Sequence, residues 1–207
     1  MSSRGQLFIV SAPSGSGKST IVNQVLNEVP DLIFSVSFTT RSPRGHERDG
    51  IEYHFVSENV FQQMINEGQF IEHAKVFDHY YGTARSTVEA ASTQGKDVIL
   101  DIEAEGATQV RRQIADTVSV FIFPPSYSAL KNRLEQRGQD QQETILKRLD
   151  WAKRAEITRY REYDFVIVNE NLSLSVNLLK SIIIAERCRK KRSIERIESI
   201  IKTFGGI

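Results

Sequence analysis

A short apolar run that leads into a glycine- and serine-rich turn and then a lysine is the feature that most restricts how this chain folds. Residues 7–10 (LFIV) precede the segment SAPSGSGKST, residues 11–20. An apolar run of this length is typical of a strand that is buried on both faces of a parallel sheet. Apolar residues return at positions 21, 22, 25 and 26, a spacing that places them on one side of a helix. The glycines therefore lie at a turn between a buried strand and a helix.

A turn of this kind is suited to bind phosphate. Gly15 and Gly17 can adopt backbone geometries that turn N–H groups inward around an anion, and the helix that follows adds unpaired N–H groups and partial positive charge. Lys18 can reach the outer phosphates of a nucleotide, and the Ser19 hydroxyl can ligate the accompanying Mg²⁺. The usual pattern has glycine where this chain has Ala12. The alternative is a turn that only caps a helix, but the flanking strand and helix favour a phosphate-binding loop. Its residues are Ser11, Ala12, Pro13, Ser14, Gly15, Ser16, Gly17, Lys18, Ser19 and Thr20.

Length and composition indicate one globular domain. The 207 residues are enough for a buried core, and the hydrophobic fraction of 40% and charged fraction of 26% are ordinary. A net charge of +1 does not favour binding to nucleic acid or to a membrane surface. The single cysteine, Cys188, excludes an internal disulfide or a cysteine-rich metal site and fits a reducing compartment.

No apolar run approaches the roughly 20 residues that span a bilayer, so we expect a cytoplasmic protein without a membrane partner. The basic run RCRKKR, residues 187–192, allows contact with nucleic acid or membrane, but it follows a helical pattern whose last turn favours cations. We interpret it as a solvated helix end and expect no nucleic-acid partner. The sequence assigns neither an oligomeric state nor a role for residues 193–207.

The order of the apolar runs predicts an α/β fold. Further runs lie at residues 98–100, 118–123 and 165–168, with helical patterns between or after them. This alternation indicates a parallel sheet flanked by crossover helices. The last run leads into a long amphipathic helix, for which the sequence suggests an apolar face of Leu174, Leu178, Ile182 and Ala185.

Two segments, 37–96 and 133–159, do not fit the alternation. The first mixes short strand-like pieces with polar turns, and the second is charged and helical. Both are expected over the mouth of the phosphate loop, where ligand-binding residues of open α/β sheets gather. We therefore divide the chain into a core (1–36, 97–132 and 160–207), an inserted binding subdomain (37–96) and a helical lid (133–159).

The first insertion contains a candidate for a second phosphate site. Arg41 and Arg44 flank a proline-stiffened link, so their guanidinium groups can converge on one phosphate. Tyr53 and Tyr81 can donate hydroxyls to the same group. Solvated loop arginines and half-buried tyrosines are the alternative that these residues leave open when taken alone.

The motifs resemble, in order, those of the guanylate kinase family. They are the loop itself, SVSFTTRSPR, EYHFV, FIEHA, YYGT, ILDI and RGQD, and they span about residues 6–186. The resemblance implies a P-loop nucleoside monophosphate kinase that transfers the γ-phosphoryl group of ATP to GMP with Mg²⁺, a step of purine nucleotide metabolism. It also implies a parallel core sheet flanked by helices, a GMP-binding insertion and a helical lid.

The same resemblance assigns residues to GMP. The phosphate ligands correspond to Arg41, Arg44, Tyr53 and Tyr81, and the guanine contacts correspond to Ser37, Glu72 and Thr83. Asp101 corresponds to the acid that helps to order Mg²⁺ and GMP. Glu103 stands where the family commonly has aspartate, which leaves open whether it contacts GMP directly, through water, or only stabilises a helix start.

For ATP, the resemblance implies that Arg137 and Arg148 close over the transferring phosphoryl group and that Arg133 closes over the ATP end. Asn169 corresponds to the segment beside the adenine. Lys18, Asp101, Arg137 and Arg148 are thus the candidate catalytic residues. Arg133 and Asn169 join the loop as ATP ligands, and Ser19 is the candidate ligand of Mg²⁺.

Two other functions remain as alternatives. A guanylate-kinase-like interaction domain keeps the fold without catalysis, but such domains typically lack the loop lysine or the lid arginines that this chain has. Another nucleoside monophosphate kinase would accept AMP or UMP, but Glu72 with Ser37 matches the hydrogen-bond donors and acceptor of guanine.

Overall fold

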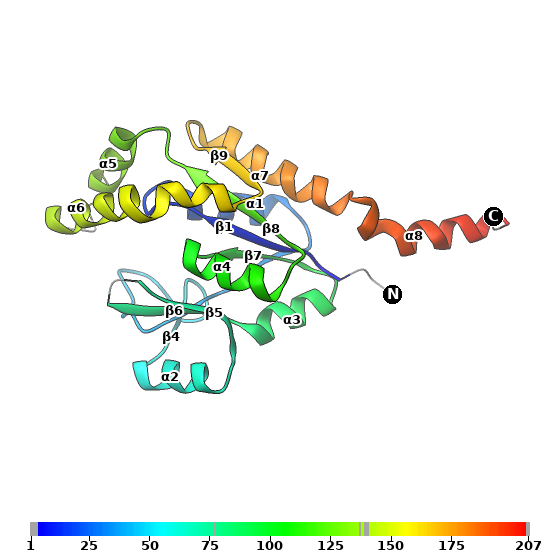
Figure 1. The fold of residues 1–207 in the computed structure, drawn as a ribbon, viewed down its shortest axis with the longest axis horizontal. Helices are drawn as coiled ribbons and strands as arrows, with labels where there is room; N and C mark the ends of the chain where they lie inside the picture. Colours follow the sequence, from blue (N-terminus) through cyan, green and yellow to red (C-terminus); the bar gives the residue numbers. More distant parts are fainter. Residues whose placement is uncertain (1–3, 77, 137, 139–140, 206–207) are drawn as a thin grey trace.

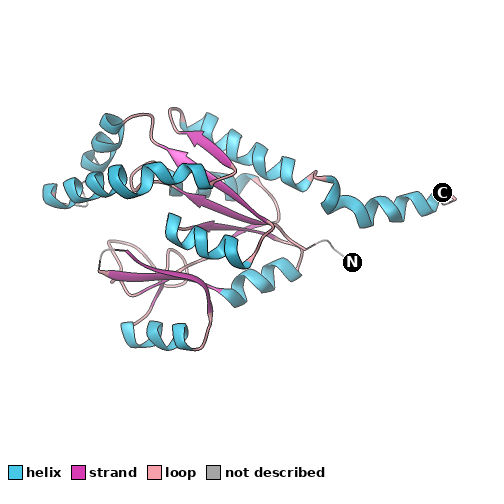
Figure 2. Cartoon of the chain, in the orientation of Figure 1, coloured by secondary structure: helices cyan, strands magenta, loops and turns pink. Residues whose placement is uncertain are grey.

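The computed structural model describes residues 4–76, 78–136, 138 and 141–205 of the chain. These residues form an α/β fold with a five-stranded sheet between layers of helices and a second, four-stranded sheet beside it (Figures 1 and 2). The predicted α/β fold with a parallel core sheet is confirmed.

All strand pairs of the larger sheet are parallel, and the spatial order is β2-β7-β1-β8-β9. The strands are β1 (Leu7–Ser11), β2 (Leu32–Phe34), β7 (Asp97–Asp101), β8 (Thr117–Phe123) and β9 (Phe165–Val168). Four of them match the predicted apolar runs. The edge strand β2 was not predicted, because three residues carry too little periodicity to stand out.

Alternation along β1 divides the core between the two faces of the sheet. Phe8 and Val10 pack in one cluster with α1 (Lys18–Glu28) and α7 (Leu172–Arg187). Leu7 and Ile9 face the opposite way, toward α3 (Arg85–Thr93) and α4 (Ala104–Gln113). Both faces of the strand are buried, as its uninterrupted apolar sequence predicted.

The second sheet has the order β4-β3-β6-β5 and lies within the predicted binding subdomain. Its strands are β3 (Phe38–Thr39), β4 (His54–Phe55), β5 (Phe70–Val76) and β6 (His79–Ala84). Helix α2 (Glu58–Asn66) packs on it through Phe61 and Met64, which meet Phe70 in a separate small core.

The charged segment after β8 forms helices with a small core of their own. They are α5 (Tyr127–Gln136), α6 (Gln142–Trp151), the π-helical turn η1 (Ala152–Glu156) and the 3₁₀ turn η2 (Ile157–Glu162). Leu130 and Leu134 of α5 pack against Ile145 and Leu149 of α6. This packing holds the two helices together as a unit.

The expected apolar face of the helix after β9 is wrong for three of its four residues. In α7, Leu174, Leu178 and Ala185 are exposed and Ile182 packs partly against the core, whereas Val176, Leu179 and Ile183 are buried against the sheet. Apolar residues occur on both faces of this helix, so periodicity alone selects no single face. Burial follows the position of α1, which packs beside it.

The basic run, residues 187–192, lies at the end of α7 and the start of α8 (Lys190–Thr203). Arg189, Lys190 and Lys191 are exposed, as expected for a solvated helix end, and several cations of the run also pair with acids of the same chain. Arg187 forms an ion pair with Asp97, and Lys191 and Arg192 both contact Asp116. Helix α8 leads away from the core toward the C-terminus (Figure 1). No helix among the described residues is both long and apolar enough to cross a membrane.

The buried face of α7 predicts that two neighbouring leucines, Leu178 and Leu179, contribute differently to the free energy of unfolding. Leu179 has no exposed surface, so Leu179→Ala leaves a cavity and should lower the free energy of unfolding by about 2–5 kcal/mol. Leu178 is 42% exposed, and Leu178→Ala should change the free energy of unfolding by less than about 1 kcal/mol. Urea unfolding of both variants measures the difference, and equal losses would contradict the packing of this helix.

Candidate functional site

A cavity of about 1000 Å³ lies where the phosphate loop, the second sheet and the lid helices meet. The described candidate residues all line it except Ser11 and Thr83, which are buried behind its wall. Those that line it are residues 12–20, Ser37, Arg41, Arg44, Tyr53, Glu72, Tyr81, Asp101, Glu103, Arg133, Arg148 and Asn169. Arg137 lies outside the described residues.

The loop requires glycine at two positions. Gly15 and Gly17 have φ angles of +93° and +91°, a region that side chains disfavour. A Cβ at Gly15 would also lie 2.9 Å from Leu134, and one at Gly17 would lie 2.5 Å from Asn169. The departure at Ala12 is accommodated, because its methyl group is buried in the core beside β1.

Two polar side chains brace the loop from outside. The Ser16 carbonyl accepts hydrogen bonds from Asn169 Nδ2 at 2.7 Å and from Arg133 Nη1 at 3.0 Å. Arg133 Nη2 donates to the Asn169 carbonyl at 2.9 Å, and Ser175 Oγ donates to Asn169 Oδ1 at 3.0 Å. In this structure Arg133 and Asn169 therefore hold the loop backbone in place.

Asp101 contacts both loop side chains that were predicted to act on a nucleotide. Its carboxylate forms an ion pair with Lys18 and accepts a hydrogen bond from Ser19 Oγ at 3.1 Å. Burial opposes the charge of Lys18, but the carboxylates of Asp101 and Glu103 outweigh it and raise the pKa of Lys18 above its ordinary value. Lys18 is therefore a firmly charged ammonium group at the mouth of the loop.

Arg41 is held as a planar fork. Its Nη1 and Nη2 atoms donate to the two carboxylate oxygens of Glu47 at 2.9 and 3.0 Å, and Nη1 also donates to the Ser42 carbonyl at 2.8 Å. The same Glu47 accepts from the Arg44 backbone N–H at 2.8 Å. Glu47 thus fixes both the Arg41 side chain and the turn that carries Arg44.

The two candidate tyrosines lie together beside this fork. The rings of Tyr53 and Tyr81 meet edge to face with centroids 5.9 Å apart, and the Arg41 guanidinium lies 5.3 Å from the Tyr53 ring centroid. Burial, with the negative charge of Asp101, raises the pKa of Tyr53 above its ordinary value. Its hydroxyl stays protonated near neutral pH and can donate a hydrogen bond.

Glu72 is a buried carboxyl group without a cationic partner among the described residues. It lies opposite Thr83 in the β5–β6 pair, and its Oε1 accepts from Thr83 Oγ1 at 2.6 Å. Burial raises the pKa of Glu72 to about 7, aided by the charge of Glu103 and opposed by the hydrogen bonds from Thr83. A buried acceptor of this kind suits a ligand that brings its own N–H donors.

The lid helices reach the loop from the far side. Arg148 of α6 donates from Nη1 to Ser14 Oγ at 3.3 Å, and Leu134 of α5 lies against Gly15. The cavity therefore has cationic groups over the phosphate loop, on α6 and at the Arg41 fork, and a buried carboxyl group at Glu72 that is not ion-paired among the described residues.

Known proteins resemble this chain over most of its length. A family model described as guanylate kinase matches residues 4–186. This chain belongs to the guanylate kinase family. The guanylate kinase of Syntrophotalea carbinolica is 47% identical over 192 residues, which cover 93% of this chain and 91% of that protein. The guanylate kinase of Thermotoga maritima is 42% identical over 195 residues, with 94% of each chain covered.

A solved structure of the family agrees with the fold. The crystal structure of guanylate kinase from Anaplasma phagocytophilum superposes with a TM-score of 0.79 at 31% sequence identity. The match covers 99% of this chain and 97% of that one.

The sequence reasoning missed several residues of the cavity lining, Glu47 and Glu156 among them. Glu47 lies three residues after Arg44, so a carboxylate close to a cluster of arginines was a usable signal. Glu156 of η1 also lines the cavity, but a single glutamate in a charged helical segment gives no such signal.

Glu156 faces Glu103 at the base of the lid. Its side chain is buried close to the Glu103 carboxyl group, and no described residue forms a hydrogen bond with its Oε2 atom. Burial first, and then the nearby charge of Glu103, raise the pKa of Glu156 to about 8, against the attraction of Lys18. At neutral pH Glu156 is therefore mostly protonated, which explains how two carboxyl groups share one place.

The raised pKa of Glu156 predicts a pH-dependent stability. Because the folded pKa is above that of the unfolded chain, its contribution is full below about pH 4.5 and is lost as pH rises through about 8. Gln cannot ionise, so the melting temperature of Glu156→Gln relative to wild type should rise by about 3 °C or more from pH 6 to pH 9.

Glu143→Gln on α6 is the matched control. The hydrogen bond and charge of Lys147 lower the pKa of Glu143, so this group is ionised over the whole interval. The difference in melting temperature between Glu143→Gln and wild type should stay constant between pH 6 and pH 9. If the difference for Glu156→Gln is constant as well, Glu156 does not have the raised pKa described above.

Proposed function

We propose that this chain transfers the γ-phosphoryl group of ATP to GMP, giving ADP and GDP, and that the cavity described above is its active site. The observation that carries the proposal is that one cavity is lined by Lys18 on the phosphate loop, by the Arg41 fork and by the buried carboxyl group of Glu72. Two anion sites and one group able to read a base are what a nucleoside monophosphate kinase for GMP needs. The single cysteine and the absence of a long apolar run favour the cytoplasm as its compartment.

The donor nucleotide would lie on the phosphate loop. Residues 14–20 offer backbone N–H groups, Lys18 meets the charge of the outer phosphates, and Arg148 approaches from the lid. Arg133 and Asn169 would contribute both through the loop that they brace and at the ATP end. For Arg137 the proposal rests on the family resemblance of RGQD alone.

Mg²⁺ fits the oxygen donors beside Lys18. Ser19 Oγ and the Asp101 carboxylate are within hydrogen-bond distance of each other, and Mg²⁺ prefers such ligands while keeping waters and substrate phosphates. No group of three or more His, Cys, Asp or Glu side chains in the described part of the chain could hold a metal by itself. Ser19 would ligate the ion together with ATP, Asp101 would help to order it, and the ion would neutralise phosphate charge.

The acceptor phosphate would bind between the arginines and the tyrosines. Arg41 presents a fork suited to bidentate contact, and the Arg44, Tyr53 and Tyr81 side chains line the same wall. Glu47 occupies the Arg41 fork in this structure, so the guanidinium must share its donors or turn when the phosphate arrives. The phosphate oxygen is ionised near neutral pH and needs no general base to attack.

Glu72 would select guanine. The Watson–Crick edge of guanine presents two adjacent N–H donors, at N1 and at the 2-amino group, and an ionised carboxylate accepts both. Ser37 would serve O6 through its rotatable hydroxyl, and Thr83, whose hydroxyl donates to Glu72 in this structure, would have to turn to join it. Glu103 lies within the electrostatic range of Glu72. Adenine has a lone pair at N1 and no donor at position 2, so it leaves the buried carboxylate unmet. This contrast argues against AMP as the acceptor.

The subdomain division follows the same roles. Residues 37–96 would carry GMP, residues 133–159 would form the lid, and residues 1–36, 97–132 and 160–207 would form the core. Positioning, charge neutralisation and exclusion of water would then account for catalysis. An interaction domain that binds a partner protein does not require this set of convergent cations.

Lys18→Ala tests the chemistry. The ammonium group meets charge that grows in the transition state, so turnover should fall about a thousandfold or more. Lys180→Ala is the control, because Lys180 forms a surface ion pair with Glu28 of α1, far from the cavity lining. Coupled measurement of ADP release checks both variants. Turnover of Lys18→Ala within tenfold of wild type would remove this role.

Glu72→Gln tests the choice of substrate. Replacing one of two acceptor oxygens by an amide should lower kcat/KM for GMP at least about a hundredfold, or about 2.7 kcal/mol, and collapse the GMP:AMP ratio. Because the pKa of Glu72 is about 7, the carboxylate forms as pH rises from 6 to 8, and the gap between wild type and variant should widen over that interval. The second ionisation of the GMP phosphate, near pH 6, affects both proteins alike. An unchanged GMP:AMP ratio would mean that guanine is read elsewhere.

A further inference from the structure

Helix α4 covers the open edge of β5, the strand that carries Glu72. In the second sheet β5 pairs with β6 on one side only, so its other edge presents unpaired backbone groups. Gln109 of α4 closes this edge: its Oε1 accepts from the His73 N–H at 3.1 Å and its Nε2 donates to the His73 carbonyl at 2.8 Å. Gln113 Nε2 donates to the Ile71 carbonyl at 2.7 Å. The strand is thus held by side chains on both sides of Glu72.

Gly106 lies on the same face of α4, three residues before Gln109. A Cβ at this position would lie 2.9 Å from Glu72 Cδ and closer still to Oε2, inside any real contact distance. Gly106 is helical and is not among the residues with positive φ. The reason for glycine here is therefore space, because the carboxyl group of Glu72 lies directly against the helix backbone.

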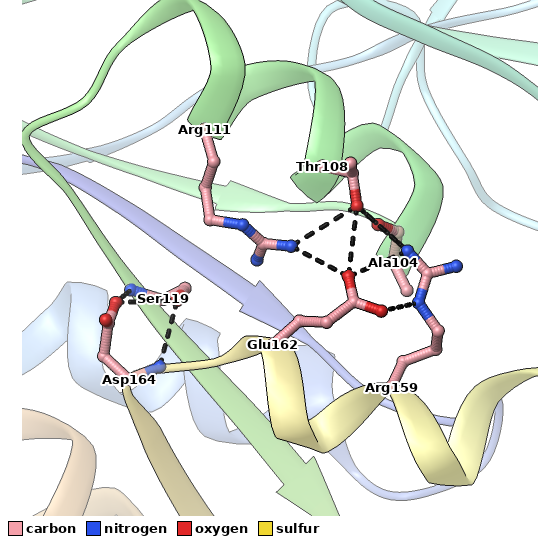
Figure 3. Close-up of polar contacts among 7 residues, drawn as sticks. All are labelled: Ala104, Thr108, Arg111, Ser119, Arg159, Glu162 and Asp164. Carbon is pink, nitrogen blue, oxygen red and sulfur yellow. Dashed lines mark hydrogen bonds and ion pairs between the residues drawn. The ribbon is translucent and has the colours of Figure 1, made fainter.

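The opposite side of α4 is anchored, which opposes a shift of the helix that would relieve such a contact. Figure 3 shows Thr108 and Arg111 of α4 meeting Glu162 and Arg159 of η2. Arg159 Nη2 donates to Thr108 Oγ1 and to Glu162 Oε2, each at 2.9 Å, and Arg111 Nη2 donates to Glu162 Oε2 at 3.1 Å. Ala107 and Val110 of the same helix are buried in the core beside β1.

We propose that α4 is a positioning element for guanine selection, in which Gly106 and Gln109 fix where the Glu72 carboxyl group lies. The inference rests on the proposed role of Glu72 as the reader of guanine. Gly106 leaves the space that determines how close the Glu72 carboxyl group lies to the backbone of α4. Gln109 holds the position of β5, the strand that carries Glu72. Recognition of two adjacent donors tolerates little displacement, since a shift of about 1 Å loses the geometry of both hydrogen bonds.

Gly106→Ala is the direct test. The added methyl group forces the Glu72 carboxyl group away from the helix, so KM for GMP should rise at least tenfold while KM for ATP stays within threefold. Alanine is also the better helix former, so a loss of GMP affinity cannot be assigned to a weaker helix. Thermal unfolding and both KM values are measured together. An unchanged KM for GMP would overturn the proposal.

A double-mutant cycle with Glu72→Asp separates displacement from general damage. Aspartate is one methylene shorter and withdraws from the added methyl group. The kcat/KM of the double variant for GMP should therefore be no lower than that of the worse single variant. Fully multiplicative losses would show that Gly106 does not act through Glu72 and would overturn the proposal.

Gln109→Ala keeps the proposal testable if Gly106→Ala fails to fold. Without its two bonds to His73, β5 should loosen, raising KM for GMP at least fivefold with KM for ATP within threefold. Gln63→Ala is the matched control, because Gln63 is an exposed glutamine of α2 whose side chain donates a hydrogen bond to Glu67 of the same segment. Equal effects on both KM values, or equal effects of the two variants, would overturn the role of Gln109.

The experiments distinguish failure of the proposed function from failure of this inference. If Glu72→Gln leaves the GMP:AMP ratio unchanged, the proposed guanine site fails. If only the α4 variants have no effect, the inference about α4 fails alone.

Discussion

The phosphate-loop end of the cavity depends on the ion pair between Lys18, at the start of α1, and Asp101, at the end of β7. The β1–β7 register places Val10 opposite Asp101, so the acid stands beside the loop that begins where β1 ends. Parallel pairing brings both carboxyl ends to one edge, and the N-terminus of α1 points at the same place. Asp101 then sets the charge of Lys18 and the orientation of Ser19 together.

The part of the cavity lined by Glu47 and Glu72 uses carboxyl groups in a different way. Glu47 is bound to Arg41, so its pKa is lowered despite partial burial, and it acts as a stationary partner of a cation. Glu72 has a hydroxyl donor instead of a cation, and burial raises its pKa to about 7. The two glutamates show why residue type alone does not reveal a role. Glu47 holds an arginine in place, whereas Glu72 has oxygen atoms that can still accept hydrogen bonds from a ligand.

Local features of the sequence were predicted well, because they depend on neighbours in the chain. The buried β1, the turn at Gly15 and Gly17 and the start of α1 follow from the residues of a single short segment. The residues proposed to bind guanine required the family resemblance, since Ser37 precedes β3, whereas Glu72 lies on β5 and Thr83 on β6. Nothing in a single sequence states that β5 and β6 pair with Glu72 opposite Thr83.

The failures have the same physical origin. The buried face of α7 is decided by what lies beside it, and both of its faces carry apolar residues. Glu156 and Gln109 act through contacts with residues far away in the chain, Glu103 and His73 respectively. Such pairs leave no periodic pattern, and only a folded structure places them together.

Helix α4 shows how one such element joins several parts of the site. Gly106, Gln109 and Gln113 face β5, whereas Ala104, Thr108 and Arg111 face η2, where the lid returns to the core. Glu103, at the start of the same helix, lines the cavity and contacts Glu156. Glycine costs up to about 1 kcal/mol in a helix relative to alanine, somewhat less within the first turn, so local propensity does not favour it at position 106. Glycine permits the close approach of Glu72 to a helix that is held by η2 on its other side. The position of the Glu72 carboxyl group therefore depends on how the rest of the core holds this helix.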